Sequence, residues 1–209
     1  MMRAAVPALL AALALLGGCG ENATAPADTE SGQVPGGEPA GEDTAQAGDG
    51  VEVEMRDAQD QPVGTVTLTA DGERTRVAAS IDGLEPGFYG FHVHQNADCD
   101  PDAPDGPFTT AGGHYSPEGG AHGAHAGDLP NLLVGEDGRA EMTVSTDRFA
   151  LGDLRAAGGA FIVHAGADNH ANVPERYLDG GPPDEDTLAT GDAGPRQACG
   201  VIGEPAATS

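Results

Sequence analysis

Short runs of alternating residues constrain the fold of this chain more than any other feature. From residue 51 onward, apolar and polar side chains alternate with a period of two, as they do in strands that bury one face. Turn sequences such as Asp71-Gly72 and Asp137-Gly138 separate the runs. The alternating runs lie at residues 51–55, 63–68, 76–81, 88–94, 131–134, 140–145 and 160–163.

This pattern predicts an all-β fold, a Greek-key β-sandwich or flattened barrel of about eight antiparallel strands. Only residues 151–157 are compatible with a helix, and a short one. Two long segments without a strand pattern, residues 95–130 and 165–195, are expected to be functional loops. We assign residues 51–203 to the folded domain and residues 204–209 to a C-terminal tail.

The first 50 residues differ in composition from the rest. Arg3 precedes an apolar stretch, residues 4–16, that is too short to span a bilayer and is followed by Gly17-Gly18-Cys19. The end of this segment, Leu16-Gly17-Gly18-Cys19, resembles a bacterial lipobox, so residues 1–18 are expected to be a lipoprotein signal peptide and Cys19 to be lipidated. An ordinary cleaved signal peptide with an incidental cysteine is the alternative.

Residues 19–50 are almost wholly small or polar and predict a disordered tether behind the anchor. The chain is therefore expected to be exported and held at a membrane of the cell envelope through Cys19, facing the periplasm or the cell surface. The formal net charge is −25, and the chain contains no lysine. Such a charge argues against nucleic acid as a partner.

Two further cysteines, Cys99 and Cys199, remain if Cys19 carries lipid. In an oxidising compartment they are expected to form a disulfide. Closing a loop of about 100 residues would stabilise the fold by up to ~4.7 kcal/mol in the chain-entropy description. Two unrelated buried thiols are the alternative.

Six of the seven histidines form an ordered set, and His170 is left over. His92 and His94 lie two residues apart in a predicted strand, so both imidazoles project from one face while the opposite face is apolar. Taken alone, this pair is equally compatible with two surface histidines. His164 ends another predicted strand and can approach the first pair. Imidazoles without sulfur ligands suit copper.

A second group of ligand types lies in the long loop at residues 95–130. His122, His125 and Asp128 are closely spaced, and His114 follows two glycines that let its side chain approach a metal. Three imidazoles and a carboxylate suit tetrahedral zinc.

Five segments, taken in order, resemble the bacterial copper/zinc superoxide dismutases of the lipoprotein type. The resemblance covers residues 51–203 and is carried by residues 90–94, 111–115, 125–130, 163–168 and 191–203. It implies two metal sites that share a bridging His114. The implied copper ligands are His92, His94, His114 and His164, and the implied zinc ligands are His114, His122, His125 and Asp128.

The resemblance also implies roles for residues that carry no signal of their own. Asp168 matches a carboxylate that hydrogen-bonds one copper-side and one zinc-side histidine. Arg196 matches the cation that orients the substrate anion. Without the surrounding motifs, Asp168 would be interpreted as a solvated loop residue and Arg196 as the partner of a surface carboxylate. Cys99 and Cys199 match the disulfide of the family.

The implied activity is dismutation of superoxide by a redox-cycling copper, with Arg196 and His114 as catalytic groups and zinc as the second metal. Two alternatives stay open: a non-enzymatic copper-binding or copper-buffering lipoprotein on the same scaffold, and a copper-only dismutase. The second arises because only Gly123 and Ala124 separate two zinc ligands, fewer residues than in most members. The sequence is compatible with a monomer or a homodimer.

The loop at residues 165–195 also carries an acidic run, Asp184-Glu185-Asp186. Because no lysine offsets this charge, we expect superoxide to associate slowly and with a weak or inverted dependence on salt.

Overall fold

The computed structural model describes residues 50–203, which include the whole predicted domain from residue 51 onward. The predicted signal peptide, Cys19, most of the tether and the C-terminal tail lie outside the described residues. Within residues 50–203, no helix is long and apolar enough to cross a membrane.

The described residues form nine strands and two short α-helices. The strands are β1 (Val51–Asp57), β2 (Pro62–Asp71), β3 (Arg74–Asp82), β4 (Gly87–Tyr89), β5 (Phe91–His94), β6 (Leu132–Val134), β7 (Arg139–Thr146), β8 (Gly159–His164) and β9 (Arg196–Ile202). The helices are α1 (Leu151–Ala157) and α2 (Glu185–Thr190), with 3-10 turns at Thr109–Ala111 and Glu175–Tyr177.

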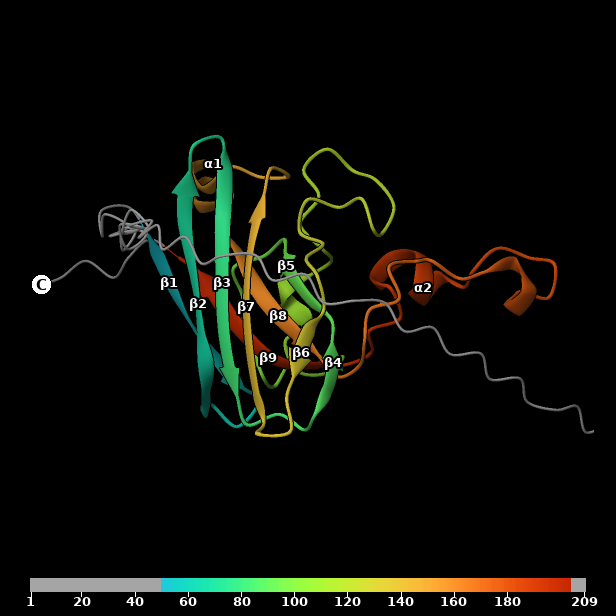
Figure 1. Ribbon diagram of the computed structural model, residues 1–209, viewed down its shortest axis with the longest axis horizontal. Coiled ribbons are helices and arrows are strands. Elements are labelled where there is room, and N and C mark those ends of the chain that lie inside the picture. The colour runs from blue at the N-terminus through green and yellow to red at the C-terminus, as the bar shows by residue number, and fades with distance from the viewer. Residues whose placement is uncertain (1–49, 204–209) are drawn as a thin grey trace, which may run out of the picture. The chain divides into compact units, whose positions relative to one another are not determined.

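The strands confirm the predicted all-β antiparallel architecture. Seven strands form one sheet in the order β5-β8-β9-β1-β2-β3-β7, and β4 pairs with β6 in a small second sheet. The last strand, β9, returns to lie beside the first, as expected for Greek-key connections. Figure 1 shows the sheet curled, with β1, β2, β3 and β7 forming one wall and β9, β8 and β5 the other.

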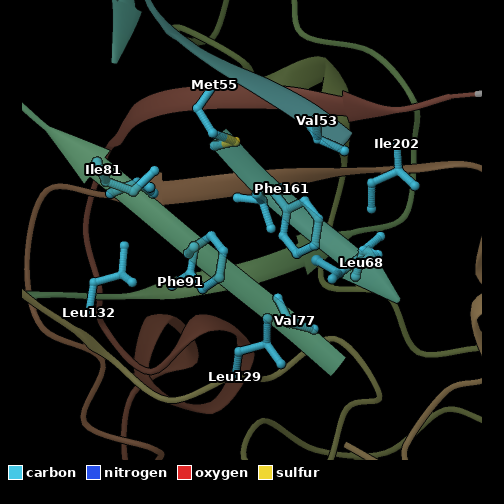
Figure 2. Close-up of a cluster of buried hydrophobic side chains, with 14 of the residues drawn as sticks. Val53, Met55, Leu68, Val77, Ile81, Phe91, Leu129, Leu132, Phe161 and Ile202 are labelled. Carbon is cyan, nitrogen blue, oxygen red and sulfur yellow. The ribbon is translucent and has the colours of Figure 1, made fainter. Parts of the chain in front are cut away.

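The core lies between these walls. Along β1, Val51, Val53 and Met55 are buried while the intervening glutamates are exposed, as the alternation predicts. In the centre, the rings of Phe91 and Phe161 stack with their centroids 5.3 Å apart (Figure 2). Both rings belong to the neighbouring strands β5 and β8 of one wall, and they lie on the core side, opposite the histidines of β5.

The predicted strand at residues 88–94 is wrong in one respect, because it is interrupted at Gly90 and divided between the two sheets. The backbone N–H of Gly90 donates to the carbonyl of Gly166 (2.7 Å), and its own carbonyl accepts from the N–H of His164 (2.8 Å). A Cβ atom at this position would lie only 2.7 Å from that of Ala193. Close approach of distant loops, which no local pattern reports, therefore divides the strand.

The two predicted long loops are present and contain little regular structure. The short helix α1 coincides with the predicted helical segment. The sequence pattern missed α2, which lies inside the second loop. Asp184, from the acidic run, is the N-cap of this helix and accepts a hydrogen bond from the backbone N–H of Thr187 (2.9 Å).

Candidate metal centre

Strand β5 joins the loop ligands to the sheet. Phe91 and Val93 point into the core and are fully buried, so His92 and His94 project from the opposite face. The backbone of Val93 accepts from the N–H of Tyr115 (2.8 Å) and donates to the carbonyl of Gly127 (2.9 Å). These bonds draw two distant parts of the first long loop, at residues 113–115 and 127–128, alongside β5.

Strand β8 delivers His164 from the other side. The β8–β9 register shifts between Val163 and His164, so that His164 lies opposite Arg196. Such a bulge re-aims a side chain relative to the regular alternation of the strand. It places a histidine and an arginine side by side at the rim of the sheet.

The four histidines that the resemblance assigns to copper form one buried cluster. The Nδ1 atoms of His94 and His164 face the carbonyls of Gly112 (2.8 Å) and Gly194 (2.9 Å). Because a carbonyl only accepts, each Nδ1 carries the proton and each Nε2 presents a lone pair. These two Nε2 atoms are 3.3 Å apart. Two lone pairs at this distance favour a cation between them.

The other two members of the cluster present unpaired nitrogens. His92 donates from Nε2 to Asp168 Oδ2 (2.9 Å), which leaves its buried Nδ1 without a hydrogen bond. The Nε2 of His114 is also buried and unpaired. Each unsatisfied buried polar atom costs about 1–3 kcal/mol. A copper ion would satisfy them, because one ligand atom from each of the four residues lies within 4.8 Å of the others.

The second cluster converges on one oxygen of Asp128. The Nδ1 atom of His114 lies 2.8 Å from Asp128 Oδ1, and the Nδ1 atoms of His122 and His125 both lie 3.3 Å from it. Neighbouring ligands of a tetrahedral zinc with bonds of about 2.0–2.1 Å are about 3.3 Å apart. The four residues therefore fit zinc despite the short spacing, with His114 facing both clusters.

The two clusters have opposite protonation preferences. Burial lowers the pKa of His92 to about 4 and that of His164 to about 3, so these imidazoles are neutral at neutral pH. Burial also lowers the pKa of His122, but hydrogen bonds with Asp128 and Asp168 outweigh it and raise the value to about 9. A positive charge is therefore disfavoured at His92 and His164 and favoured at His122.

Asp168 connects the two clusters. Its Oδ2 accepts from His92, and its Oδ1 lies 2.7 Å from Nε2 of His122. Burial raises the pKa of the Asp168 carboxyl, but the hydrogen bonds from His122 and His92 hold it well below its usual range. Gly191 covers this contact so closely that a Cβ atom there would collide with Asp168 and His122.

Two residues around Asp168 were not identified from the sequence. The side chain of Asn131 accepts from the backbone N–H of Asp168 (2.8 Å) and donates to its carbonyl (2.9 Å). The leftover histidine, His170, donates its backbone N–H to Asp168 Oδ1 (2.6 Å). Asn131 directly precedes β6 and belongs to no recognisable motif. It could not be identified from the sequence because it comes next to Asp168 only in the folded chain.

Arg196 is held beside the first cluster. Its guanidinium donates to the carbonyls of Phe108 and Gly112. The Gly112 carbonyl is the same one that fixes Nδ1 of His94, so a single backbone group positions both side chains. A disulfide between Cys99 and Cys199, with Cα atoms 5.7 Å apart, connects this loop to β9. The predicted pairing is thus present.

A pocket of about 410 Å³ opens next to Arg196 and reaches His164. Its remaining walls come from both long loops and include three carboxylates: Asp105, Asp186 and Asp192. Asp186 belongs to the acidic run at residues 184–186, so part of that run lines the pocket that leads to Arg196 and His164. The structure thus brings every predicted site residue between 92 and 199 into one region of the fold.

Fold and site together define an antiparallel β-barrel protein with two adjoining, histidine-rich clusters that can hold metal ions. The family model for copper/zinc superoxide dismutase (SODC) matches residues 62–202. A Cu-Zn superoxide dismutase of Mycolicibacterium paratuberculosis is 41% identical over 185 residues, covering 79% of this chain and 81% of the relative. The chain belongs to the copper/zinc superoxide dismutase family.

Two further comparisons agree with this assignment. The Cu-Zn superoxide dismutase of Mycobacterium bovis is 47% identical over 150 residues, which cover 66% of this chain. The chain spans 59% of the length of that relative. The structure of the Cu/Zn superoxide dismutase from Brucella abortus superposes with a TM-score of 0.60 at 30% identity, covering 74% of this chain and 99% of the other.

Proposed function

We propose that this protein dismutates superoxide in the cell envelope, using copper held by His92, His94, His114 and His164 and zinc held by His114, His122, His125 and Asp128. The observation that carries the proposal is the set of buried ring nitrogens that face one another without hydrogen-bond partners, next to a fixed arginine. Such a set is costly in a protein that binds no cation.

The overall reaction converts two superoxide anions and two protons into dioxygen and hydrogen peroxide. When bound, copper supplies the electron transfer, alternating between its cupric and cuprous states. The protein has to admit a small anion, orient it and provide protons.

Arg196 is suited to orient the anion. A guanidinium has five N–H donors, and two of its donors are occupied by the carbonyls of Phe108 and Gly112. The remaining donors are available to the pocket that Arg196 lines with His164. Because the occupied donors hold the side chain in place, little entropy is lost when an anion binds.

His114 is suited to hold a proton next to the reacting anion. Its Nδ1 is engaged by Asp128, whereas its Nε2 is buried and faces the other three histidines without a partner. A proton on Nε2 would therefore lie close to the oxygen species that is reduced. Burial lowers the pKa of His114, which makes a proton held there easy to release.

The test is metal reconstitution of the purified chain. We expect loading with copper and zinc to give dismutase activity, with copper alone giving part of it, and Arg196→Ala to lose most of the rate while retaining copper. Full copper occupancy without activity would instead favour a copper-binding or copper-buffering protein. Equal activity with and without zinc, and no zinc uptake, would favour a copper-only dismutase.

The proposed location rests on the disulfide and on the sequence before residue 51. A stable disulfide is typical of proteins in oxidising, extracytoplasmic compartments. We further propose that residues 1–18 are removed, that Cys19 carries the lipid, and that residues 19–50 tether the domain at residues 51–203. Expression of the chain and of Cys19→Ser, followed by detergent phase partitioning, checks this. The anchor is refuted if both forms remain in the aqueous phase.

A further inference from the structure

The shortened loop between His122 and His125 is held from outside by an arginine that belongs to neither metal cluster. Arg148 follows β7 and is exposed to solvent. Its Nη1 donates to the carbonyl of His125 (3.0 Å), and its Nη2 donates to the carbonyl of Gly123 (3.2 Å). One planar fork therefore spans the turn that separates the two ligands.

The opposite side of the same turn is held by Asp128. Its Oδ2 accepts from the backbone N–H of Gly123 (2.7 Å) and from that of His125 (2.9 Å). Its Oδ1 is the oxygen on which the three histidine Nδ1 atoms converge. The N–H groups of the turn thus bind the ligand carboxylate, and the carbonyls of the turn bind Arg148.

The backbone on which Arg148 sits is fixed by the core. The carbonyl of the next residue, Phe149, accepts a hydrogen bond from the buried hydroxyl of Thr75 on β3 (3.0 Å). The Phe149 ring packs edge-on against Tyr115, which directly follows His114 (centroids 6.5 Å apart). The guanidinium is therefore presented from the rigid sheet, although its own surface is exposed.

From these contacts we infer that Arg148 is a positioning residue for the zinc ligands His122 and His125. Gly123, inside the turn, has a φ of +88° and adds no side chain that could stiffen it. A turn this short has few conformations that aim both flanking imidazoles at one point. Arg148 selects such a conformation by binding both carbonyls with two nitrogens held in one rigid plane, whereas the single ammonium nitrogen of a lysine would fix their spacing less well.

This inference rests on the proposed zinc site and is tested by metal binding, without an activity assay. Zinc affinity is measured by competition with a chromophoric chelator on the full chain, and ligand geometry by the visible absorption of Co²⁺ bound in place of zinc. We expect Arg148→Gln to weaken zinc binding by about 10- to 100-fold, the range for groups that support metal ligands. The cobalt bands should shift or weaken, while copper affinity stays unchanged.

The matched control is Arg139→Gln, which removes the same charge from the beginning of β7, where Arg139 pairs with Asp82 at the surface (3.2 Å). It should leave zinc affinity and the cobalt spectrum unchanged. If Arg148→Gln fails to fold without metal, Arg148→Lys decides instead, because it keeps the charge but loses the fork. Lysine should give weaker zinc binding than arginine.

Three results would overturn the inference. The first is a variant of Arg148 whose zinc affinity and cobalt spectrum equal those of the unchanged protein. It would show that the turn keeps its conformation without the guanidinium of Arg148. An equal loss in Arg139→Gln would indicate a general charge effect. If the unchanged protein takes up copper but no zinc, the proposed zinc site itself fails, and the role of Arg148 fails with it.

Discussion

The proposed copper-side and zinc-side halves of the site are built in different ways. Three of the four copper-side histidines stand on paired strands, β5 and β8, and two of them are oriented by backbone carbonyls. Apart from the shared His114, the zinc-side ligands all lie within one loop, at residues 122–128. They are oriented by one another, by Asp168 and by the guanidinium of Arg148.

This difference indicates which half is prepared before a metal binds. The strand half has its ring orientations fixed by the fold, and its nitrogens are neutral because burial lowers their pKa values. In the loop half, the carboxylates of Asp128 and Asp168 lie next to His122 and raise its pKa. Without metal, His122 therefore holds a proton at a position where the surrounding charges favour a cation. We therefore expect the copper half to keep most of its affinity for copper when the zinc half is disrupted.

The largest effect is expected from removing one ligand in each half. His164→Ala should lower copper affinity and dismutase activity by more than about 100-fold, since even supporting groups contribute 10- to 100-fold. Zinc affinity should be nearly unchanged. His122→Ala should abolish zinc binding and leave most of the copper affinity. Metal titrations of both variants check this, and a comparable loss of both metals in each variant would contradict the proposed independence.

Asp168→Asn should affect both halves together. Its two oxygens separately hold His92 and His122, and an amide can accept at only one of these positions. We expect affinity for each metal to fall by about 10- to 100-fold. Asp179→Asn, at an exposed position in the same loop, is the control and should change neither. If only copper binding weakens, the hydrogen bond between Asp168 and His122 does not contribute to zinc affinity.

The comparison of halves also explains what the sequence could and could not predict. His92 and His94 were assigned to one face because strand alternation is a local rule, and the apolar Phe91 and Val93 between and before them supported it. The two loops were located by the absence of that alternation. Long-range contacts have no such signature: the bulge at His164, the interruption at Gly90 and the Asn131–Asp168 pair depend on segments far apart in the chain.

Other differences have equally specific causes. Strand β9 was not found by alternation, because its sequence from Arg196 to Ile202 mixes polar and small residues with apolar ones. Helix α2 was missed because its six residues contain only one large apolar side chain, Leu188, so that they show no helical period. Roles in the site came from resemblance to a family, since neither Asp168 nor Arg196 stands out by composition. Arg148, outside the family motifs, was not identified at all.

The opposite protonation preferences predict how the metal-free protein responds to pH. The folded-state pKa values of His92 and His164 lie below the ordinary value, so the unfolded chain takes up protons first and stability falls as pH drops below about 6.5. The folded-state pKa of His122 is raised, so its contribution is complete below about 6.5 and is lost as pH rises through about 9.

Stability without metal should therefore peak near pH 6.5. At about 1.4 kcal/mol per pKa unit, each of these histidines should contribute about 1–3 kcal/mol to its limb over the accessible pH range. Thermal unfolding in chelator between about pH 5 and pH 9.5 measures it, above the range in which the Asp128 and Asp168 carboxyls titrate. His164→Gln should make the acid limb shallower, because His92 still contributes to it, and His122→Gln should flatten the alkaline limb. A profile in which both variants change the same limb would refute the proposed electrostatic contrast.

The smallest effect concerns the entrance, which serves the copper half alone. Asp105, Asp186 and Asp192 line the pocket that leads to Arg196, so an approaching anion meets three carboxylates around one fixed cation. Removing one charge about 10 Å from the anion's path changes its energy by roughly 0.4 kcal/mol in water, or about twofold in rate. We expect Asp186→Asn to raise the association rate by about this factor at low salt, and Glu52→Gln, exposed on β1, to leave it unchanged.

In the unchanged protein, added salt should leave the association rate of superoxide level or increase it slightly, because screening weakens a net repulsion. A rate that falls steeply with salt would mean that Arg196 dominates the field at the entrance despite the acidic wall.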